Sequence, residues 1–384
     1  MTFEFATAGT IVFGDGATER LGSTAAGLGS RPLLVTGASP GRAAPAMAQL
    51  EAAGLSWESF AVTGEPTVDT VRHGVEAARE GECDMVVAFG GGSAIDAGKA
   101  IAALVTNPGP ISRYLEVIGD AQPLTADPLP MVAMPTTAGT GAEVTRNAVM
   151  ASPEDRVKVS LRHPKMLPAA ALVDPVHTHG APPEVTAATG LDALTQVIEP
   201  LVSHRASPLT DGFCREAIPR AAASLARAYR DGSDASARSD MSLVSLLGGL
   251  ALANAALGAV HGFAGPLGGM HAAPHGAICG RLLPLVVEAN VAALRDREPD
   301  HPVLARFVEV AQLLTGQPGA TVDEGVGWLQ GLCDELAVPG LASYGMTRQD
   351  VPAAVEAAAR SSSMKGNPIV LTDGELTSVL ERAL

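Results

Sequence analysis

The first half of the chain alternates strand-like and helical segments, and this alternation restricts the fold more than any other feature. Strand signals cover residues 32–36, 56–62, 84–89 and 130–134. Helical patterns cover residues 43–53, 68–80 and 94–105. Strands that alternate with helices predict parallel β-α-β units and therefore an open, mostly parallel, doubly wound sheet of the Rossmann-like α/β class. The first segment, TFEFATAGTIVFG, is expected to form a hairpin that turns at Ala8-Gly9.

Beyond Asp174-Pro175 the pattern changes to helices alone. Helical periods cover residues 183–203, 209–230, 239–263, 281–295, 301–315, 322–336 and 348–362. The segment HTHGAPP, rich in proline and glycine, lies at the change and is typical of a domain boundary. We therefore expect an NAD(P)-binding α/β domain over residues 1–178 and an all-helical domain, which binds metal and substrate, over residues 179–384.

The composition excludes several classes of protein. A formal net charge of −15 argues against a nucleic-acid or anionic-membrane partner, since both require a positive field. Residues 242–280 contain no Asp, Glu, Lys or Arg and are long enough to span a bilayer. They also carry Asn254, Pro266, Pro274 and many glycines. We expect a central core helix here and no membrane span.

The four cysteines are far apart and form no CxxC pair. Without such a pair or a signal peptide, they are expected to be buried free thiols in a reducing compartment. The sequence therefore predicts a cytoplasmic protein.

A glycine-rich segment, FGGGSAIDAGK at residues 89–99, joins an apolar strand to a helix. Its glycines allow the backbone to approach a ligand, and the helix N-terminus offers free N–H groups, with Ser93 as a candidate cap. These features predict a pyrophosphate site at the carboxyl end of a parallel strand. The segment is neither GxGxxG nor a P-loop, and the alternative is a turn that binds no ligand.

A second loop, PTTAGTGAEVT at residues 135–145, also follows a strand. Its hydroxyl groups alternate with glycines, so they offer small donors and acceptors to a flat or phosphorylated ligand. Such loops are common and the signal is weak by itself. Together with the first loop, it predicts a second ligand-facing loop at the same edge of the sheet.

One carboxylate and two imidazoles form a candidate metal site. Asp192 opens a helical run, and His261 and His275 follow in segments of small and apolar residues. A buried carboxylate without a counter-ion is costly, so we expect the three to converge on a divalent cation, with room for a substrate oxygen. Gln196 lies one helical turn after Asp192, where a second ligand from this helix would lie. The alternative for either histidine alone is a core residue.

Five motifs in order resemble the iron-containing (group III) alcohol dehydrogenases: FGGGSAIDAGK, PTTAGTGAEVT, ALVDP, GLDALTQVIE and AVHGFAGPLGGMHAAPHG. The similarity runs from about residue 3 to about residue 380. Maleylacetate reductases belong to the same superfamily, and glycerol dehydrogenases and dehydroquinate synthases are more distant relatives. The resemblance implies the dehydroquinate synthase-like architecture, with NAD(P)(H) on the N-terminal domain and a divalent metal in the cleft between the domains. We also expect a homodimer.

The resemblance also assigns residues by position. It implies that Gly91, Gly92 and Ser93 bind the cofactor pyrophosphate and that Asp96 and Lys99 support the loop. The pyrophosphate and nicotinamide would be flanked by Thr136, Thr137 and Thr140. Three of the family's four metal ligands are matched by Asp192, His261 and His275.

Two positions depart from the family pattern. Gln196 stands where iron enzymes have the fourth ligand, a histidine, and Gly265 stands where many members have a histidine beside the substrate. Glycerol dehydrogenase-like relatives bind metal, usually zinc, with an acid and two histidines. The expected metal is therefore Fe²⁺ or Zn²⁺, with Gln196 as a weak fourth ligand.

The implied reaction transfers a hydride between a nicotinamide and an alcohol, aldehyde or ketone, whose carbonyl the metal polarises. His271 is the candidate proton relay, unless it is a surface or packing histidine. The turn from Gly37 to Arg42 lacks the acid with which NAD-preferring members hold the ribose. Ser39 and Arg42 could contact a 2′-phosphate, which favours NADP(H) over NAD(H).

Three cations, Arg146, Lys158 and Arg162, could bind an anionic substrate, unless they form a solvated basic strip. Their segment is similar in layout to that of maleylacetate reductases. One alternative is therefore metal-independent reduction of an acidic unsaturated or keto substrate, although that group typically lacks the acid at the position of Asp192. A second alternative is a non-catalytic nucleotide-binding protein.

Overall fold

The computed structural model describes residues 2–155 and 157–384, and the chain divides into two compact units. An α/β unit comprises Ala6–Thr137 and Gly141–His179. A helical unit comprises Gly180–Leu384, together with Ala138–Thr140 and an N-terminal segment that ends at Phe5. The predicted fold class, a parallel α/β part followed by an all-helical part, is confirmed.

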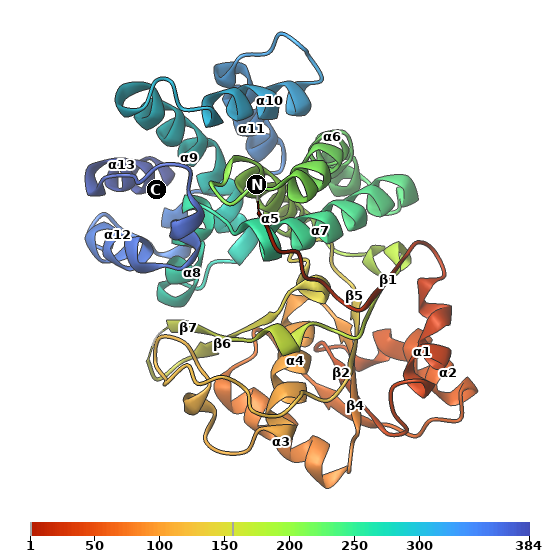
Figure 1. Ribbon diagram of the computed structural model, residues 1–384. Helices are drawn as coiled ribbons and strands as arrows, with labels where there is room; N and C mark the ends of the chain where they lie inside the picture. Colours follow the sequence, from red (N-terminus) through yellow and green to blue (C-terminus); the bar gives the residue numbers. More distant parts are fainter. Residues whose placement is uncertain (1, 156) are drawn as a thin grey trace. The chain divides into compact units, whose positions relative to one another are not determined.

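Six parallel strands form the sheet of the α/β unit, in the order β1-β8-β5-β4-β2-β3 (Figure 1). The strands are β1 (Thr10–Phe13), β2 (Pro32–Thr36), β3 (Glu58–Ala61), β4 (Met85–Gly90), β5 (Met131–Pro135) and β8 (Ala170–Val173). From β2 the chain moves outward to β3 on one side. From β4 it moves through β5 to β8 on the other side. The direction of winding therefore reverses between β2 and β4, and open sheets of this kind bind ligands at such a switch point.

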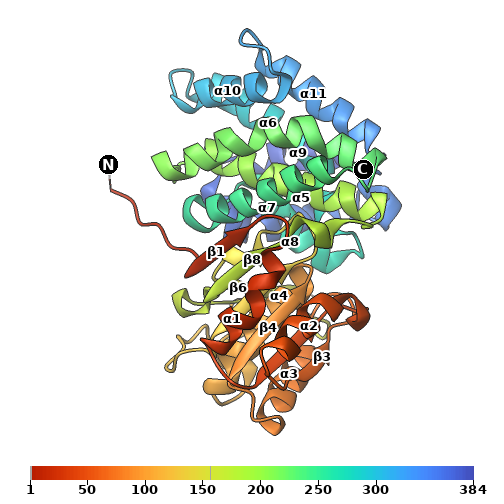
Figure 2. The same cartoon turned by 90° about the vertical axis from the view of Figure 1, so that its right-hand side faces the viewer.

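The N-terminal segment does not form the predicted hairpin. Thr10–Phe13 pairs in parallel with Ala170–Val173, and Figure 2 shows β1 beside β8. The buried strand β8 needs a partner on its outer side, and β1 supplies it, which local turn signals cannot reveal. A second difference is a two-stranded antiparallel sheet of β6 (Asn147–Ser152) and β7 (Val157–Arg162).

Helices cover both faces of the main sheet, as the apolar strands require. One face carries α1 (Leu21–Ala26) and α2 (Ala44–Ala52), and the opposite face carries α3 (Val68–Glu80) and α4 (Gly92–Thr106) (Figure 1). Successive residues of β2 serve the two layers in turn. Leu34 packs with α1 and α2, whereas Leu33 and Val35 pack with α3 and α4.

The helical unit is built around α5 (Pro183–Val202), which is buried along most of its length. The other helices are α6 (Pro208–Arg230), α7 (Ala235–Ala255), α8 (Ala259–Met270), α9 (His275–Arg297), α10 (Val303–Thr315), α11 (Val322–Glu335), α12 (Val351–Arg360) and α13 (Asp373–Ala383). Helices α6, α7 and α9 pack directly against α5. Because α5 is enclosed in this way, any polar side chain on it must find its partners inside the unit.

The single helix predicted over residues 239–263 is two helices in the structure. Helix α7 ends at Ala255, and α8 begins at Ala259 after a bend of 100°. Ala256 has a φ of 62°, and Gly258 forms the N-cap of α8. The break places His261 in the first turn of α8 instead of late in a longer helix.

Helix α9 is long and apolar enough to cross a membrane by length and composition. Of its most apolar 18-residue window, 78% is buried within the protein. A helix that is apolar on all sides is typical of a protein core as well as of a membrane. We therefore describe α9 as a core helix of the helical unit.

Helix α9 approaches α5 so closely that only glycine fits at the contact. A Cβ atom on Gly276 would lie 1.9 Å from the backbone oxygen of Ala188, and one on Gly280 would lie 2.5 Å from Leu191 Cδ1. Backbone cannot move aside as a flexible side chain can, so Gly276 fixes the distance between the two helices. This distance decides which side chains of the first turns of α9 reach α5.

We predict that Gly276→Ala destabilises the protein by about 1–3 kcal/mol, because the added methyl group overpacks the helix contact. A control is Gly331→Ala, where an added Cβ has nothing within 4 Å and the helix gains up to about 1 kcal/mol. Urea unfolding measures both free energies. Equal stability of the two variants would show that α5 and α9 do not touch at Gly276.

A buried acid lies in the second Gly/Thr loop of the α/β unit. Glu143 is 2% exposed in a short 3₁₀ turn, Ala142–Val144. Burial raises the pKa of its carboxyl to about 7, although its own backbone N–H and the charge of Lys99 act in the opposite direction. The folded protein therefore binds a proton at Glu143 more tightly than the unfolded chain does.

This preference predicts a pH dependence of stability. The folded pKa lies above the ordinary value of 4.5, so the stabilisation is fully present below about pH 4.5 and disappears as pH rises through about 7. The free energy of unfolding should fall by about 3 kcal/mol from this group between pH 5 and pH 9. Glu143→Gln, which mimics the neutral acid, should lack that component, so wild type and variant are compared by urea unfolding across this range. Parallel curves would contradict the assignment.

Candidate functional site

Three helices of the helical unit bring four metal-ligating side chains together. One ligand atom each from Asp192, His261, His275 and Cys279 lies within 4.8 Å of all the others. Asp192 Oδ1 is 3.2 Å from His261 Nε2 and 3.8 Å from His275 Nε2. Cys279 Sγ is 3.9 Å from His261 Nε2. The three residues predicted to converge do lie together, and a cysteine joins them.

Local structure explains how each side chain reaches the cluster. Asp192 lies in the middle of α5, where it is 2% exposed. The break before α8 turns His261 toward it, and Pro274 starts α9 at His275. Cys279 follows His275 by four residues and therefore lies on the same face of α9. The His275 side chain is 35% exposed, whereas the other three members of the cluster are buried. Solvent therefore reaches the cluster at His275.

A second carboxylate, Glu199, holds His261 from behind. Its Oε2 lies 2.7 Å from His261 Nδ1, and its Oε1 accepts a 2.7 Å hydrogen bond from the N–H of Val260. A carboxylate on one ring nitrogen fixes the tautomer and leaves the other nitrogen for a metal. Glu199 therefore directs His261 Nε2 toward Asp192.

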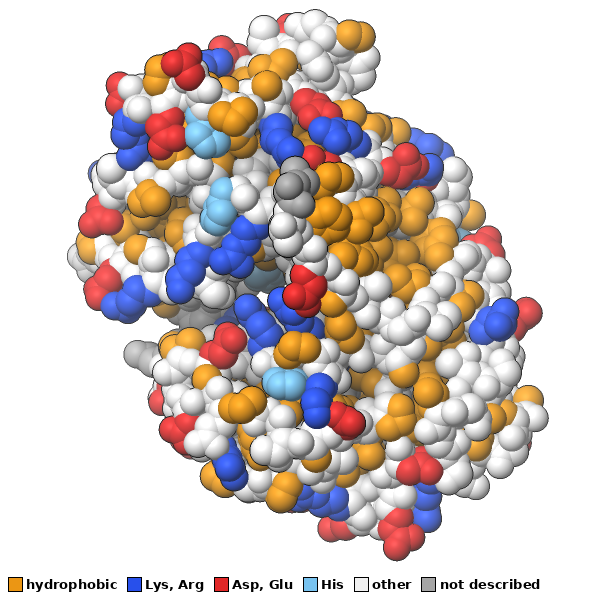
Figure 3. Space-filling model, viewed as in Figure 1, with side chains coloured by type: hydrophobic (Ala, Val, Ile, Leu, Met, Phe, Trp, Pro, Cys, Tyr) orange, Lys and Arg blue, Asp and Glu red, His pale blue; other side chains and the backbone are white. Residues whose placement is uncertain are grey.

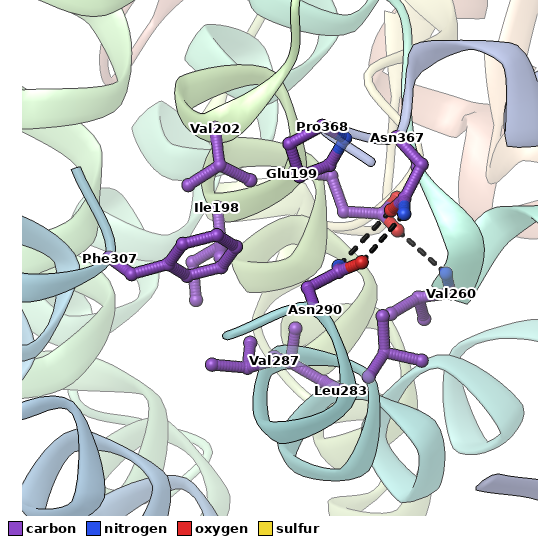
Figure 4. A pocket seen from close by; sticks show the side chains of 12 residues that line it. Ile198, Glu199, Val202, Val260, Leu283, Val287, Asn290, Phe307, Asn367 and Pro368 are labelled. Carbon is purple, nitrogen blue, oxygen red and sulfur yellow. Dashed lines mark hydrogen bonds between the residues drawn. The ribbon is translucent and has the colours of Figure 1, made fainter. Parts of the chain in front are cut away.

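Figure 4 shows the packing around this carboxylate. Asn290 and Asn367 exchange hydrogen bonds of 3.1 and 2.6 Å between their amides. Asn367 Oδ1 also accepts from the N–H of Ala259, which fixes the start of α8. The cavity beside these residues has a volume of about 10 Å³, the space of about one water molecule. The residues around the cavity hold Glu199 and the start of α8 in place, and the cavity itself is too small to bind a substrate.

The electrostatics of the cluster favour a cation. Although burial opposes it, the hydrogen bond from His261 and the charges of His275 and His261 bring the pKa of Asp192 below its ordinary value. Burial lowers the pKa of His261, but the charges of Cys279 and Glu199 outweigh it and raise that pKa well above the usual range. Burial raises the pKa of the Cys279 thiol, and the two histidines bring it below its ordinary value. A divalent cation can replace the protons that these histidines otherwise hold.

Gln196, the predicted weak fourth ligand, is buried beside Asp192. Burial opposes the lowering of the Asp192 pKa, and after the two histidines the Gln196 side chain also contributes to that lowering. Its Oε1 is buried and has no hydrogen-bond partner within the described part of the chain. Gln196 therefore acts on a ligand, and its role as a ligand itself stays a prediction.

Two residues of the site were missed by the sequence reasoning. Cys279 is spaced four residues from His275, but it was interpreted with the other three cysteines as a buried free thiol. Glu199 lies seven residues after Asp192, on the same face of α5, as the one other acid in the buried part of that helix. In both cases helical spacing from a candidate ligand is the signal that identifies the residue.

His271, the candidate proton relay, ends α8 and is not one of the four clustered residues. Its Nε2 is buried without a hydrogen-bond partner in the part of the chain described. At Gly265, one turn after His261, an added Cβ would have nothing within 4 Å. A side chain at this position, where the resemblance leads us to expect a histidine, would therefore meet no clash at its Cβ.

The two glycine-rich loops lie side by side at the switch point of the sheet. Gly90 pairs with Pro135 across β4 and β5, and the N–H of Thr136 donates to the oxygen of Gly90. A Cβ on Gly91 would lie 3.3 Å from the Thr137 side chain, and a Cβ on Gly90 would lie 3.3 Å from the nitrogen of Gly37. The loops after β2, β4 and β5 thus form one edge where a nucleotide can bind.

The start of α4 has free donors, although its cap differs from the expectation. Gly91 is the N-cap, and no side chain of the described residues caps the helix, so Ser93 lies inside the first turn with Gly92. Uncapped N–H groups at a helix N-terminus are typical of a phosphate site. Asp96 Oδ2 accepts from the N–H of Val149, and Oδ1 forms a 3.0 Å ion pair with buried Lys99. Asp96 and Lys99 therefore hold the loop in place through contacts within the protein.

The remaining predicted cofactor residues lie in two places. Gly37 and Ser39 follow β2, and Ser39 is exposed, as is Arg42, which donates to the oxygen of His177. Thr140 belongs to Ala138–Thr140, the segment that clusters with the helical unit. A Cβ on the neighbouring Gly139 would lie 2.7 Å from Thr189 of α5, so this segment packs tightly there.

Two of the three cations predicted to bind an anionic substrate, Lys158 and Arg162, have acidic partners. Lys158 forms an ion pair with Glu65, and Arg162 lies 3.7 Å from Glu116. In Figure 3 basic side chains lie among acidic and apolar ones on the face viewed. Lys158 and Arg162 are therefore neutralised within the α/β unit.

We predict that Glu199→Gln lowers the affinity of the cluster for Zn²⁺ by about 10–100-fold, because the carboxylate no longer orients His261. Competition with a fluorescent chelator measures this affinity. The matched control is Glu288→Gln, since Glu288 pairs with Arg382 at the surface of α9 and should leave it unchanged. Wild-type affinity in both variants would rule out the supporting role of Glu199.

Two family models match the chain, one over the α/β unit and one over the helical unit. The iron-containing alcohol dehydrogenase family matches residues 8–175, and the C-terminal region of the Fe-containing alcohol dehydrogenase family matches residues 186–384. Alcohol dehydrogenase 4 of Saccharomyces cerevisiae is 34% identical over 378 residues, which cover 97% of this chain and 96% of the relative.

Solved structures are similar over the whole length. The crystal structure of a 1,3-propanediol oxidoreductase has a TM-score of 0.91, with 31% identity and 100% of both chains covered. The sulfoacetaldehyde reductase from Bifidobacterium kashiwanohense, solved in complex with NAD⁺, has a TM-score of 0.87, with 28% identity over 99% of this chain and 98% of that one. Two family matches that together span nearly the whole chain, with relatives of this kind, identify an oxidoreductase that belongs to the iron-containing alcohol dehydrogenase family.

Proposed function

We propose that the protein interconverts an alcohol with an aldehyde or ketone by hydride transfer to or from NAD(P), assisted by a divalent metal held by Asp192, His261 and His275. Membership of the family implies an alcohol dehydrogenase activity, a divalent metal and NAD(H). The observation that carries the proposal is the buried carboxylate Asp192 with two imidazoles beside it.

The residues present fit such a metal. Asp192 is 2% exposed, and a buried carboxylate requires a compensating positive charge. Carboxylate oxygen and imidazole nitrogen suit both Zn²⁺ and Fe²⁺. When bound, the metal supplies a Lewis acid that polarises a carbonyl oxygen.

The chain's own residues supply orientation and access. Glu199 holds His261 in place, while the packing of α5, α8 and α9 keeps Asp192 away from water. The partly exposed side chain of His275 leaves one direction from which a small substrate can approach. The role of His271 in moving protons stays a prediction.

The nucleotide is proposed to bind at the switch point of the sheet. Gly91, Gly92 and Ser93 offer the uncapped N-terminus of α4 to the pyrophosphate, and Thr136 and Thr137 lie beside them. Ser39 and Arg42 are exposed beyond β2 and favour NADP(H), whereas the sulfoacetaldehyde reductase was solved with NAD⁺. Hydride transfer then requires this nicotinamide to face a substrate held by the helical unit.

The alternatives predicted from the sequence have less support. Metal-independent reduction of an acidic substrate does not need the buried Asp192, and its candidate anion ligands Lys158 and Arg162 are paired with acids. A non-catalytic nucleotide-binding protein has no need of the metal cluster. The homodimer and the cytoplasmic location stay predictions.

The proposal predicts that metal-loaded protein oxidises NAD(P)H when supplied with aldehydes, and that Asp192→Asn lowers kcat/KM by at least about 100-fold, roughly 3 kcal/mol of transition-state stabilisation. Initial rates with a panel of short and long aldehydes, together with the metal content per chain, measure both effects. Running the panel with NADH and with NADPH tests the cofactor preference, and a higher kcat/KM with NADH would overturn it.

The matched control is Asp334→Asn, an exposed acid on α11 that should leave the rate unchanged. Full activity in chelator-treated protein without metal would favour the metal-independent alternative. Absence of NAD(P)H oxidation across the whole panel would favour the non-catalytic one.

A further inference from the structure

We propose that Cys279, and not residue 196, is the fourth ligand of this metal, and that the Asp/His/His/Cys set selects Zn²⁺ over Fe²⁺. The inference rests on the proposed function, because it assumes that Asp192, His261 and His275 hold a divalent metal. It goes further in naming the ligand that replaces the missing histidine of α5 and the metal that follows from it.

The distances in the cluster fit one tetrahedral centre. With bonds of about 2.1 Å to oxygen and nitrogen and about 2.3 Å to sulfur, ligand atoms around Zn²⁺ lie about 3.4 Å apart, or about 3.6 Å where one is sulfur. The carboxylate oxygen of Asp192 is 3.2 Å from His261 Nε2 and 3.8 Å from His275 Nε2. Cys279 Sγ is 3.9 Å from His261 Nε2. These three distances are within a few tenths of an ångström of the tetrahedral spacing, and the other pairs lie within 4.8 Å, so shifts of about 1 Å or less bring all four onto one ion.

The backbone fixes Cys279 in this position. It lies in the second turn of α9, between Gly276 and Gly280, the two glycines that bring α9 against α5. It shares a helix face with His275, so one rigid element carries both ligands. Its side chain is fully buried, and a preformed site on helices needs little rearrangement to bind an ion.

The other cysteines differ from Cys279 in what surrounds them. Cys333 Sγ donates a 3.2 Å hydrogen bond to the oxygen of Gly280, so a carbonyl already satisfies it. Cys214 is buried in the apolar core between α5 and its neighbours. Within the described residues, Cys279 is the cysteine that lies in a group of at least three metal-ligating side chains. Cys279 therefore differs from the other buried cysteines in lying beside candidate metal ligands.

Gln196 has a different role. It lies one helical turn from Asp192 on α5 and helps to lower the pKa of that carboxyl, so we assign it to orienting a ligand. A carboxamide oxygen is also a weaker ligand than a thiolate for a metal of borderline softness such as Zn²⁺. Gln196 is therefore a positioning residue.

The ligand set determines the preferred metal. Thiolate selects Zn²⁺ over harder ions, and Zn²⁺ also lies above Fe²⁺ in general affinity for nitrogen and sulfur sites. The Asp192 carboxylate and a Cys279 thiolate would carry two negative charges against the two positive charges of the ion, and Glu199 lies behind His261 as a further buried acid. The partly exposed side of His275 would be left for the substrate, since four-ligand zinc sites can expand to five ligands.

The test uses the whole protein stripped of metal and titrated with Co²⁺, whose spectrum reports its ligands. We expect one Co²⁺ per chain with tetrahedral visible bands and a thiolate-to-cobalt charge-transfer band in the near ultraviolet. The charge-transfer band should be absent in Cys279→Ser and Cys279→Ala. It should remain in the matched control Cys333→Ser and in Gln196→Met, which keeps the side-chain volume but removes the amide.

Affinity provides a second readout that does not depend on activity. Cys279→Ser should lower Zn²⁺ affinity by more than about 100-fold, the upper end of the effect of a supporting residue. Anaerobic competition between Zn²⁺ and Fe²⁺ should leave zinc in the wild type.

The possible failures separate the two proposals. Failure of the wild type to bind Co²⁺ or Zn²⁺ overturns the metal-dependent function and this inference together. One bound Co²⁺ without a charge-transfer band in the wild type overturns the inference and leaves the function standing. Loss of Co²⁺ binding in Gln196→Met, with the band intact in Cys279→Ala, assigns the fourth position to Gln196.

Discussion

The carboxylate of Asp192 lies in the middle of the most enclosed helix of the protein, and a buried charge must be compensated by partners that come to it. Each of its partners arrives from a different direction: Gln196 from the same helix, His261 from α8 and His275 from α9. Gln196 is neutral, whereas Asp192 and the two imidazoles can carry charge, and a lone buried charge is costly. The arrangement is explained if their common partner is a cation, and the rest of the helical unit then serves to hold its ligands at fixed distances.

Packing supplies that rigidity. The contact of Gly276 with the backbone at Ala188 sets how near α9 comes to α5, and the break before α8 turns His261 inward. Behind His261, Glu199 is hydrogen-bonded to the α8 backbone and lies beside the interlocked amides of Asn290 and Asn367 (Figure 4). The positions of the candidate ligands therefore depend on close helix contacts at glycine and on a buried polar network.

The parts of the structure that depend on local sequence could be predicted. Apolar strand runs and helical periods predicted the α/β-then-helical order, and residue chemistry predicted that Asp192, His261 and His275 converge. Long-range pairing could not be predicted in this way: β1 pairs with β8, more than 150 residues away, because that strand needs a neighbour. The bend at Ala256 was missed because no proline or charge marks it, and only Gly258 gives a sign of it.

Cys279 shows a different limit. Its spacing from His275 was visible in the sequence, but a cysteine in an apolar helix is usually an inert thiol, and only the meeting of three helices shows its neighbours. The family pattern shows only that a histidine is missing at position 196, on α5. The replacement lies on another helix, 83 positions later in the chain.

If one metal ion is bound at Asp192 by side chains from α5, α8 and α9, diffraction from crystals of zinc-loaded protein, recorded on both sides of the zinc absorption edge, will locate it. We expect a single anomalous peak about 2.0–2.3 Å from Asp192, His261, His275 and Cys279. A crystal of active protein without a peak at Asp192, or with its ion bound elsewhere, would contradict this expectation.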